Sequence, residues 1–125
     1  MGVKRLGVAH KTETDAGRDL IRRLKEAATV KETPRLMELL AGDPTFLDAL
    51  VCGLEWTAAN VEGFGHPTIS LEEDPEEDTE YIEVEFPVTL DVETAVHRRV
   101  ELSGIWMADV WAMAPVGLCF TEEFV

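Results

Sequence analysis

The sequence predicts an α+β fold in which about three N-terminal helices pack on one face of a C-terminal antiparallel sheet of four to five strands. Apolar residues in the first half recur with helical spacing, whereas those over 81–86 alternate as in a half-buried strand. The breaker segment Gly63–Pro67 separates the two regions. Helices followed by strands, rather than alternating with them, indicate α+β.

The length and composition fit one domain with a sizeable core, since the chain has 125 residues and 46% hydrophobic content. We therefore expect a single domain over 1–125, with a helical part over 12–62 and a mainly β part over 67–125. Residues 1–11 are expected to be flexible or to form a short strand.

The first predicted helix begins near Thr14, a candidate N-cap. Its apolar face runs from Leu20 to Ala28, at the spacing that brings side chains to one side of a helix.

Two further helices have clear start signals. Thr33-Pro34 and Asp43-Pro44 each place a capping side chain before a proline in the first helical turn. The second helix is expected to stop at Gly42, and the third to continue to about Asn60.

The second half begins with a short predicted strand over 68–71. An acidic loop is expected over 72–80, because its like charges repel one another and stay solvated. The segment Tyr81–Phe86 follows as a strand, with Glu83 and Glu85 on its outward side.

The segment 91–103 fits two structures. Asp91 can cap a helix that ends at Gly104, but the β-branched content favours a strand, in which His97 and Arg99 face outward level with the acids of a neighbour. We expect the strand, although it places Arg98 on the inner face. Ser103-Gly104 then forms a hairpin turn into a strand over 105–113, and a last strand covers 118–124.

Charge is sorted along the chain. Residues 1–35 carry a net charge of +4, residues 36–97 carry −16 with no Lys or Arg, and the whole chain carries −14. Such a field repels nucleic acid and anionic membrane and attracts basic proteins. We therefore expect no direct nucleic-acid binding, no membrane binding, and a basic protein surface as the partner.

The predicted partner-binding surface is formed by the acids of the loop and of the strand that follows it: Glu72, Glu73, Asp74, Glu76, Glu77, Asp78, Glu80, Glu83 and Glu85. Successive outward residues on a strand lie about 6.7 Å apart, whereas duplex DNA carries one charge per about 1.7 Å of its axis. Acids on several strands and an adjoining loop approach that density, which makes the surface a candidate nucleic-acid mimic. In the alternative interpretation, Arg99 and other groups on neighbouring strands neutralise the face, and the loop only aids solubility.

The loop also begins with the alternating carboxylates of a calcium-binding loop. Thr79 stands where such a loop needs glycine, Pro75 occupies its second position, and a strand rather than a helix follows. We reject an EF-hand and keep weak, non-selective Ca²⁺ or Mg²⁺ binding as an alternative.

A basic helix face over Arg18, Arg22 and Lys25 is a candidate self-association surface. Its charges can meet acids within the chain or on a second copy, giving head-to-tail or two-fold assembly.

Other reactive side chains form no recognisable site. The three histidines follow no metal-ligand spacing, so no metal and no cofactor are expected. Cys52 and Cys119 fit apolar patterns and are expected to be buried, reduced thiols. As strand residues, Trp106 and Trp111 lie on opposite faces, which makes one of them a candidate exposed anchor.

These observations favour a non-enzymatic acidic binding protein that docks on a basic protein surface. Its most concrete form is a nucleic-acid mimic, or an immunity or inhibitor protein of a nucleic-acid-handling enzyme. The alternative is a self-associating assembly or adaptor protein driven by the charge asymmetry, and a small enzyme comes third. Because neither a signal peptide nor a run long enough to span a bilayer is present, we expect a cytoplasmic protein.

Overall fold

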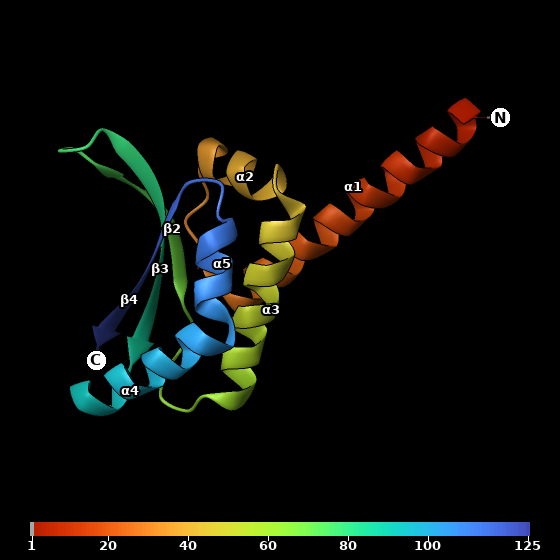
Figure 1. The fold of residues 1–125 in the computed structure, drawn as a ribbon. Coiled ribbons are helices and arrows are strands. Elements are labelled where there is room, and N and C mark those ends of the chain that lie inside the picture. Colours follow the sequence, from red (N-terminus) through yellow and green to blue (C-terminus); the bar gives the residue numbers. More distant parts are fainter. Residues whose placement is uncertain (1) are drawn as a thin grey trace.

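The fold is α+β, as predicted, with helices layered on one face of a four-stranded sheet (Figure 1). The computed structural model describes the backbone of residues 2–125 and the side chains from Asp15 onward. Its elements, in chain order, are α1 (Gly2–Ala27), β1 (Thr29–Val30), α2 (Pro34–Ala41), α3 (Pro44–Asn60), β2 (Thr68–Asp74), β3 (Thr79–Val88), α4 (Val92–Leu102), the π-helical turn η1 (Ser103–Met107), α5 (Ala108–Met113) and β4 (Gly117–Phe124).

Helices α2 and α3 begin as the sequence predicts. The Thr33 hydroxyl accepts a hydrogen bond from the Leu36 N–H at 3.2 Å, and the Asp43 carboxylate accepts one from the Phe46 N–H at 3.1 Å. Each cap satisfies an amide that the first helical turn leaves without a partner.

Helix α1 begins at Gly2, so the prediction that Thr14 is its N-cap is wrong. Residues 2–11, expected to be flexible or a short strand, are helical, and no proline interrupts the segment before Thr14. The N-terminal half of α1 projects away from the rest of the molecule (Figure 1).

The sheet is mixed, whereas a wholly antiparallel sheet was predicted. Strand order is β1-β2-β3-β4, with β2 and β3 antiparallel and the two outer pairs parallel. The long helical crossover between β3 and β4 returns the chain to the end where β3 begins, and a parallel pair requires such a connection.

That crossover consists of α4, η1 and α5, so the predicted strands over 91–103 and 105–113 are wrong. The Asp91 carboxylate caps α4 by accepting a hydrogen bond from the Thr94 N–H at 2.8 Å. Ser103-Gly104 lies in η1 rather than in a hairpin turn. The β-branched residues that favoured a strand lie on the exposed side of α4, so packing of the opposite side decides the structure.

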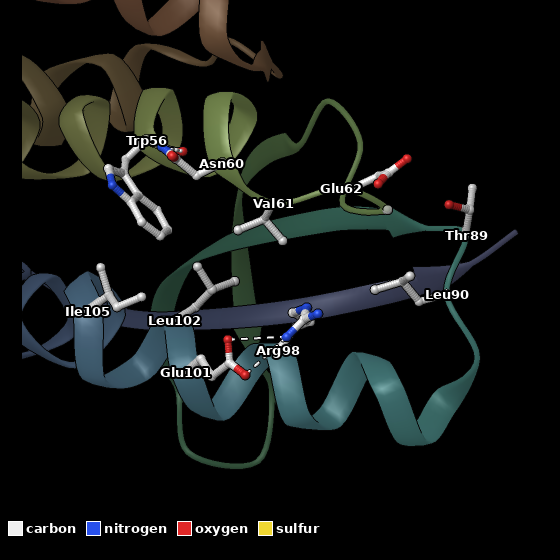
Figure 2. Close-up of a pocket in the computed structure, with 11 residues that line it drawn as sticks. Trp56, Asn60, Val61, Glu62, Thr89, Leu90, Arg98, Glu101, Leu102 and Ile105 are labelled. Carbon is white, nitrogen blue, oxygen red and sulfur yellow. Dashed lines mark hydrogen bonds and ion pairs between the residues drawn. The ribbon is translucent and has the colours of Figure 1, made fainter.

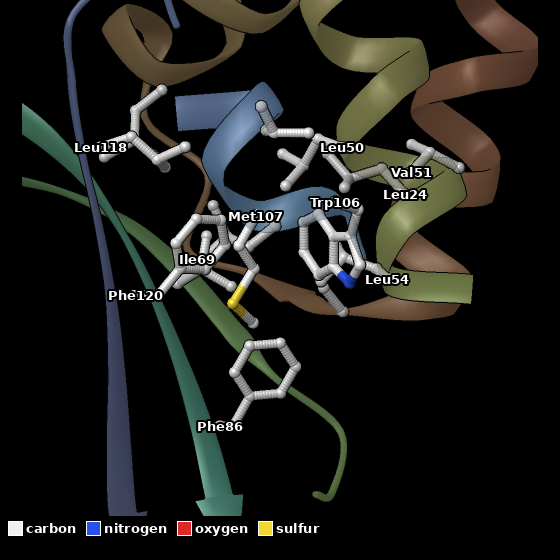
Figure 3. Close-up of a cluster of buried hydrophobic side chains, with 14 of the residues drawn as sticks. Leu24, Leu50, Val51, Leu54, Ile69, Phe86, Trp106, Met107, Leu118 and Phe120 are labelled. Atoms are coloured by element: carbon white, nitrogen blue, oxygen red, sulfur yellow. The ribbon is translucent and has the colours of Figure 1, made fainter. Parts of the chain in front are cut away.

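The core lies between the helices and the inner face of the sheet (Figure 3). Trp106 is 7% exposed, packs edge-to-face on Phe120 at 5.3 Å, and donates from its indole Nε1 to the Thr57 hydroxyl at 2.9 Å. Trp111 is 62% exposed on the same helical segment, so the prediction that the two tryptophans occupy opposite strand faces is wrong.

The cysteines also differ from prediction, since Cys52 and Cys119 are both exposed free thiols. Cys52 lies on the outward side of α3, and Cys119 lies on the side of β4 that faces away from the helices. The apolar patterns around them supply the buried neighbours, and the cysteines themselves occupy the intervening exposed positions.

Candidate functional site

The helices leave one face of the sheet uncovered (Figure 1). Along β2, β3 and β4, alternate side chains enter the core, and the intervening ones point away from the helices. We call this uncovered surface the open face. It includes Thr68, Ser70, Glu72, Tyr81, Glu83, Glu85, Cys119, Thr121 and Glu123.

Strand register sets the acids of the open face beside one another. Glu83 lies between Ser70 and Cys119, and Glu85 lies between Thr68 and Thr121. Neighbouring strands are about 4.8 Å apart and successive outward residues about 6.7 Å apart. The open face is therefore a two-dimensional array of carboxylates with fixed spacing.

Hydroxyl groups orient two of these carboxylates. Thr121 donates to Glu83 Oε1 at 3.0 Å, and Ser70 donates to Glu72 Oε1 at 2.9 Å. A neutral donor fixes the direction of a carboxylate without cancelling its charge, so the array remains both ordered and negative.

Partial burial and neighbouring carboxylates together raise the pKa of Glu85. Partial burial is the largest cause, and the carboxylates of Glu123 and Glu83 add to it, whereas Lys31 acts in the opposite direction. The pKa of Tyr81 is raised as well, mainly by partial burial and then by Glu83. The folded chain therefore holds like charges closer together than they would lie in the unfolded chain.

The segment predicted as an acidic loop over 72–80 is the end of the β2–β3 hairpin, so that prediction is corrected. Only residues 75–78 form the turn, and the residues on either side of it are strand. The Asp74 carboxylate accepts hydrogen bonds from the N–H groups of Glu76 at 3.0 Å and Glu77 at 3.4 Å, which closes the turn. Among the side chains that the structure describes, no three His, Cys, Asp or Glu groups are placed to hold a metal ion.

The nine predicted acids thus divide into groups. Glu76, Glu77 and Asp78 lie at the hairpin tip, while Asp74 forms the turn. Glu73 and Glu80 are paired across the hairpin on the opposite face from Glu72, and Glu80 forms an ion pair with Arg35 of α2 at 2.6 Å. The open face retains Glu72, Glu83 and Glu85.

The sequence prediction missed Glu123 and Cys119. Both belong to the outward positions of β4. Cys119 lies between the buried side chains of Leu118 and Phe120, and Glu123 lies between Glu122 and Phe124. The alternation in this strand carried the signal, but its pairing with β3 depends on the crossover, which was predicted incorrectly.

Basic residues of α1 are engaged within the molecule. Arg22 pairs with Asp19 at 2.5 Å and with Glu26 at 2.8 Å, and Lys25 pairs with Glu32 at 3.0 Å. The remaining predicted member of this face, Arg18, is exposed.

Arg99, which was expected to face Glu83 and Glu85 from a neighbouring strand, lies on α4 instead. It pairs with Glu122 at 2.8 Å on the helix side of β4. It is therefore not among the groups that neutralise the open face.

A separate cleft of about 570 Å³ lies between the C-terminal end of α3 and α4 (Figure 2). Trp56 and Ile105 line it while remaining 39% and 49% exposed. Arg98 also lines the cleft, and its guanidinium forms an ion pair with Glu101 at 3.1 Å. Both residues lie on α4, so the prediction that Arg98 lies on the inner face of a strand is wrong. The cleft has the size of a small-molecule site, and its lining includes no cysteine, serine, lysine or histidine.

Within the described residues, no helix combines the length and apolar character needed to cross a bilayer. The sequence matches no protein-family model, and no curated protein or solved structure matches it.

Proposed function

We propose that this chain is a non-enzymatic binding protein that docks through its open face on a basic protein surface. One observation supports this proposal above the others. None of the ion pairs found among the described side chains involves Glu72, Glu83, Glu85 or Glu123. The open face therefore presents a net negative charge on the sheet, with Lys31 as the one basic group among the described side chains that acts on Glu85.

The spacing of the array supports a partner that handles nucleic acid. Each strand of duplex DNA carries one phosphate charge per about 3.4 Å of helix axis. Carboxylates on adjacent strands and alternate residues of the sheet approach such a density over several strands. Tyr81 lies within the array and offers the aromatic contact area that protein interfaces favour. The most concrete form of the proposal is an inhibitor that occupies a nucleic-acid-binding surface.

Affinity capture with salt and DNA competition tests the proposal. The tagged chain is incubated with lysate of its native host, and the retained proteins are identified before and after a wash with duplex DNA. We expect a basic, nucleic-acid-handling protein that duplex DNA releases and that rising salt weakens. Retention of proteins that are neither basic nor displaced by DNA would refute the mimic.

Two variants with the same change in charge locate the surface. The first carries Glu72→Gln, Glu83→Gln, Glu85→Gln and Glu123→Gln, which keep shape and hydrogen bonding on the open face. The second neutralises four exposed acids elsewhere: Glu38→Gln, Asp48→Asn, Glu62→Gln and Asp109→Asn. We expect the first variant to lose the partner and the second to keep it. Equal loss in both would show that total charge, and not the open face, drives binding.

A further inference from the structure

The open face ends at β4, which is last in the sheet order. Among the residues whose backbone the structure describes, β4 pairs only with β3, so its outer edge has no partner strand there. The N–H of Val125 donates to the Val88 carbonyl of β3. The N–H and C=O groups of the odd-numbered residues of β4 therefore point toward β3. Those of Phe120, Glu122 and Phe124 therefore point outward.

Arg99 supports this orientation of the edge. Its guanidinium donates to the Phe120 carbonyl at 2.5 Å as well as to Glu122. This contact agrees with a Phe120 carbonyl that points away from β3. The peptide groups of Glu122 and Phe124 remain as an exposed strand edge, a common template for pairing with another chain.

A groove runs beside this edge on the helix side of the sheet. It consists of two cavities, of about 400 and 270 Å³, that share Arg99 and Ser103. Val96 and Val100 line one cavity and Trp111 lines the other, and they are 53%, 68% and 62% exposed. Large apolar side chains that stay exposed in a concave surface indicate a contact site.

The two sides of the β4 edge thus differ in chemistry. A strand added there would place alternate side chains on the open face, next to Glu123 of β4. Glu83 and Glu85 lie on β3, on the other side of β4 from the added strand. The intervening side chains would enter the groove against Val100 and Phe124. We propose that the partner contributes an extended segment in which basic and apolar residues alternate, and that this segment pairs with β4. This inference rests on the proposed function, since it specifies how a basic protein engages the open face.

Charge decides between such a segment and a second copy of β4. A second copy would bring its own Glu122 and Glu123 to the edge and would join two chains of net charge −14. A basic segment instead brings positive charge next to the negative charge of the open face.

Synthetic peptides test the pairing on the unaltered protein. The probe is a labelled, acetylated eight-residue peptide of alternating lysine and valine, and its binding is followed by fluorescence anisotropy. A block peptide of the same composition, with the lysines and valines separated, is the control. We expect the alternating peptide to bind at least about tenfold more tightly, because only that peptide satisfies both sides of the edge. Equal affinity for the two peptides would overturn the inference.

Backbone N-methylation gives a second test that requires no protein variant. Methyl groups on one set of alternate residues remove the amides that face β4, and those on the other set remove amides that face solvent. We expect one methylated peptide to lose binding and the other to retain it. If both bind as well as the parent peptide, no strand pairing occurs and the inference is wrong.

Groove variants complete the experiment. Val96→Ser with Val100→Ser should weaken binding of the alternating peptide about tenfold. Ile105→Ser, at an apolar position that is 49% exposed and lies outside the groove, should leave binding unchanged. A dimer that the serine pair converts to a monomer would make a second copy the occupant and overturn the proposal.

The same peptides separate this inference from the proposed function. If the alternating and block peptides bind equally and both need the open-face acids, the proposed function stands and strand addition fails. If neither peptide depends on those acids, both proposals fail.

Discussion

A methyl group added at position 53 should destabilise this protein more than one added at Gly17 or Gly104, which are also helical. Gly53 lies on α3 where the indole of Trp106 crosses it. A Cβ at this position would lie 2.7 Å from Trp106 Cζ3 and closer still to Cε3 and Cδ2. The indole of Trp106 is not free to move aside, because it is buried and hydrogen-bonded.

The magnitude follows from what Trp106 would lose. Overpacking a core costs about 1–3 kcal/mol. Displacing the indole also leaves the buried Thr57 hydroxyl without its donor, at about 1–3 kcal/mol, and breaks an aromatic pair with Phe120 worth about 0.5–1.5 kcal/mol. The helix propensity of alanine returns about 1 kcal/mol. We therefore expect Gly53→Ala to lower the free energy of unfolding by about 1.5–6.5 kcal/mol.

Urea denaturation followed by tryptophan fluorescence measures this loss. Gly17→Ala and Gly104→Ala are matched controls, because a Cβ at either helical glycine meets no atom within 4 Å. Both should be neutral or stabilised by up to about 1 kcal/mol. If Gly53→Ala were as stable as these two controls, Trp106 would not pack on α3 as described.

Two further predictions concern the open face. Glu85→Gln should raise Tm at neutral pH, because the pKa of Glu85 is raised in the folded state and its ionisation therefore destabilises the fold. The gain in Tm should vanish below the ordinary glutamate pKa, about 4.3, where the carboxyl is protonated in both states. A gain in Tm that persists at lower pH would contradict the raised pKa. Cys52 and Cys119 should both react with a thiol reagent in the native protein, and the captured basic partner should protect only Cys119, which lies on the open face, as mass spectrometry of the alkylated peptides would show. Protection of Cys52 alone would place the partner on α3.

Local signals explain which parts of the fold could be predicted. The caps at Thr33 and Asp43 act within one helical turn, so their residues alone determine where α2 and α3 begin. The alternation over β3 is also local, and it correctly placed Glu83 and Glu85 away from the core.

The crossover could not be predicted because its own valines fit two structures. Val92, Val96 and Val100 recur with helical spacing but prefer strands, and the deciding contact is the packing of Trp106 in the core beside Thr57. That contact joins segments about fifty residues apart and is invisible in a local pattern. The same error hid the place of Glu123, since β4 joins the open face only when a helix carries the chain back to pair in parallel with β3.

The parallel pairing of β3 and β4 also has a consequence for how the chain folds. The β2–β3 hairpin and the α2–α3 pair form from neighbouring segments, whereas β4 can dock only after the helical crossover has closed a long loop. Until then, β3 is itself a bare strand edge, the kind of surface through which partly folded chains aggregate. Glu83 and Glu85 lie along that edge, and their mutual repulsion between copies disfavours intermolecular pairing. The charges proposed to bind a partner in the finished protein thus protect the chain while it is still folding.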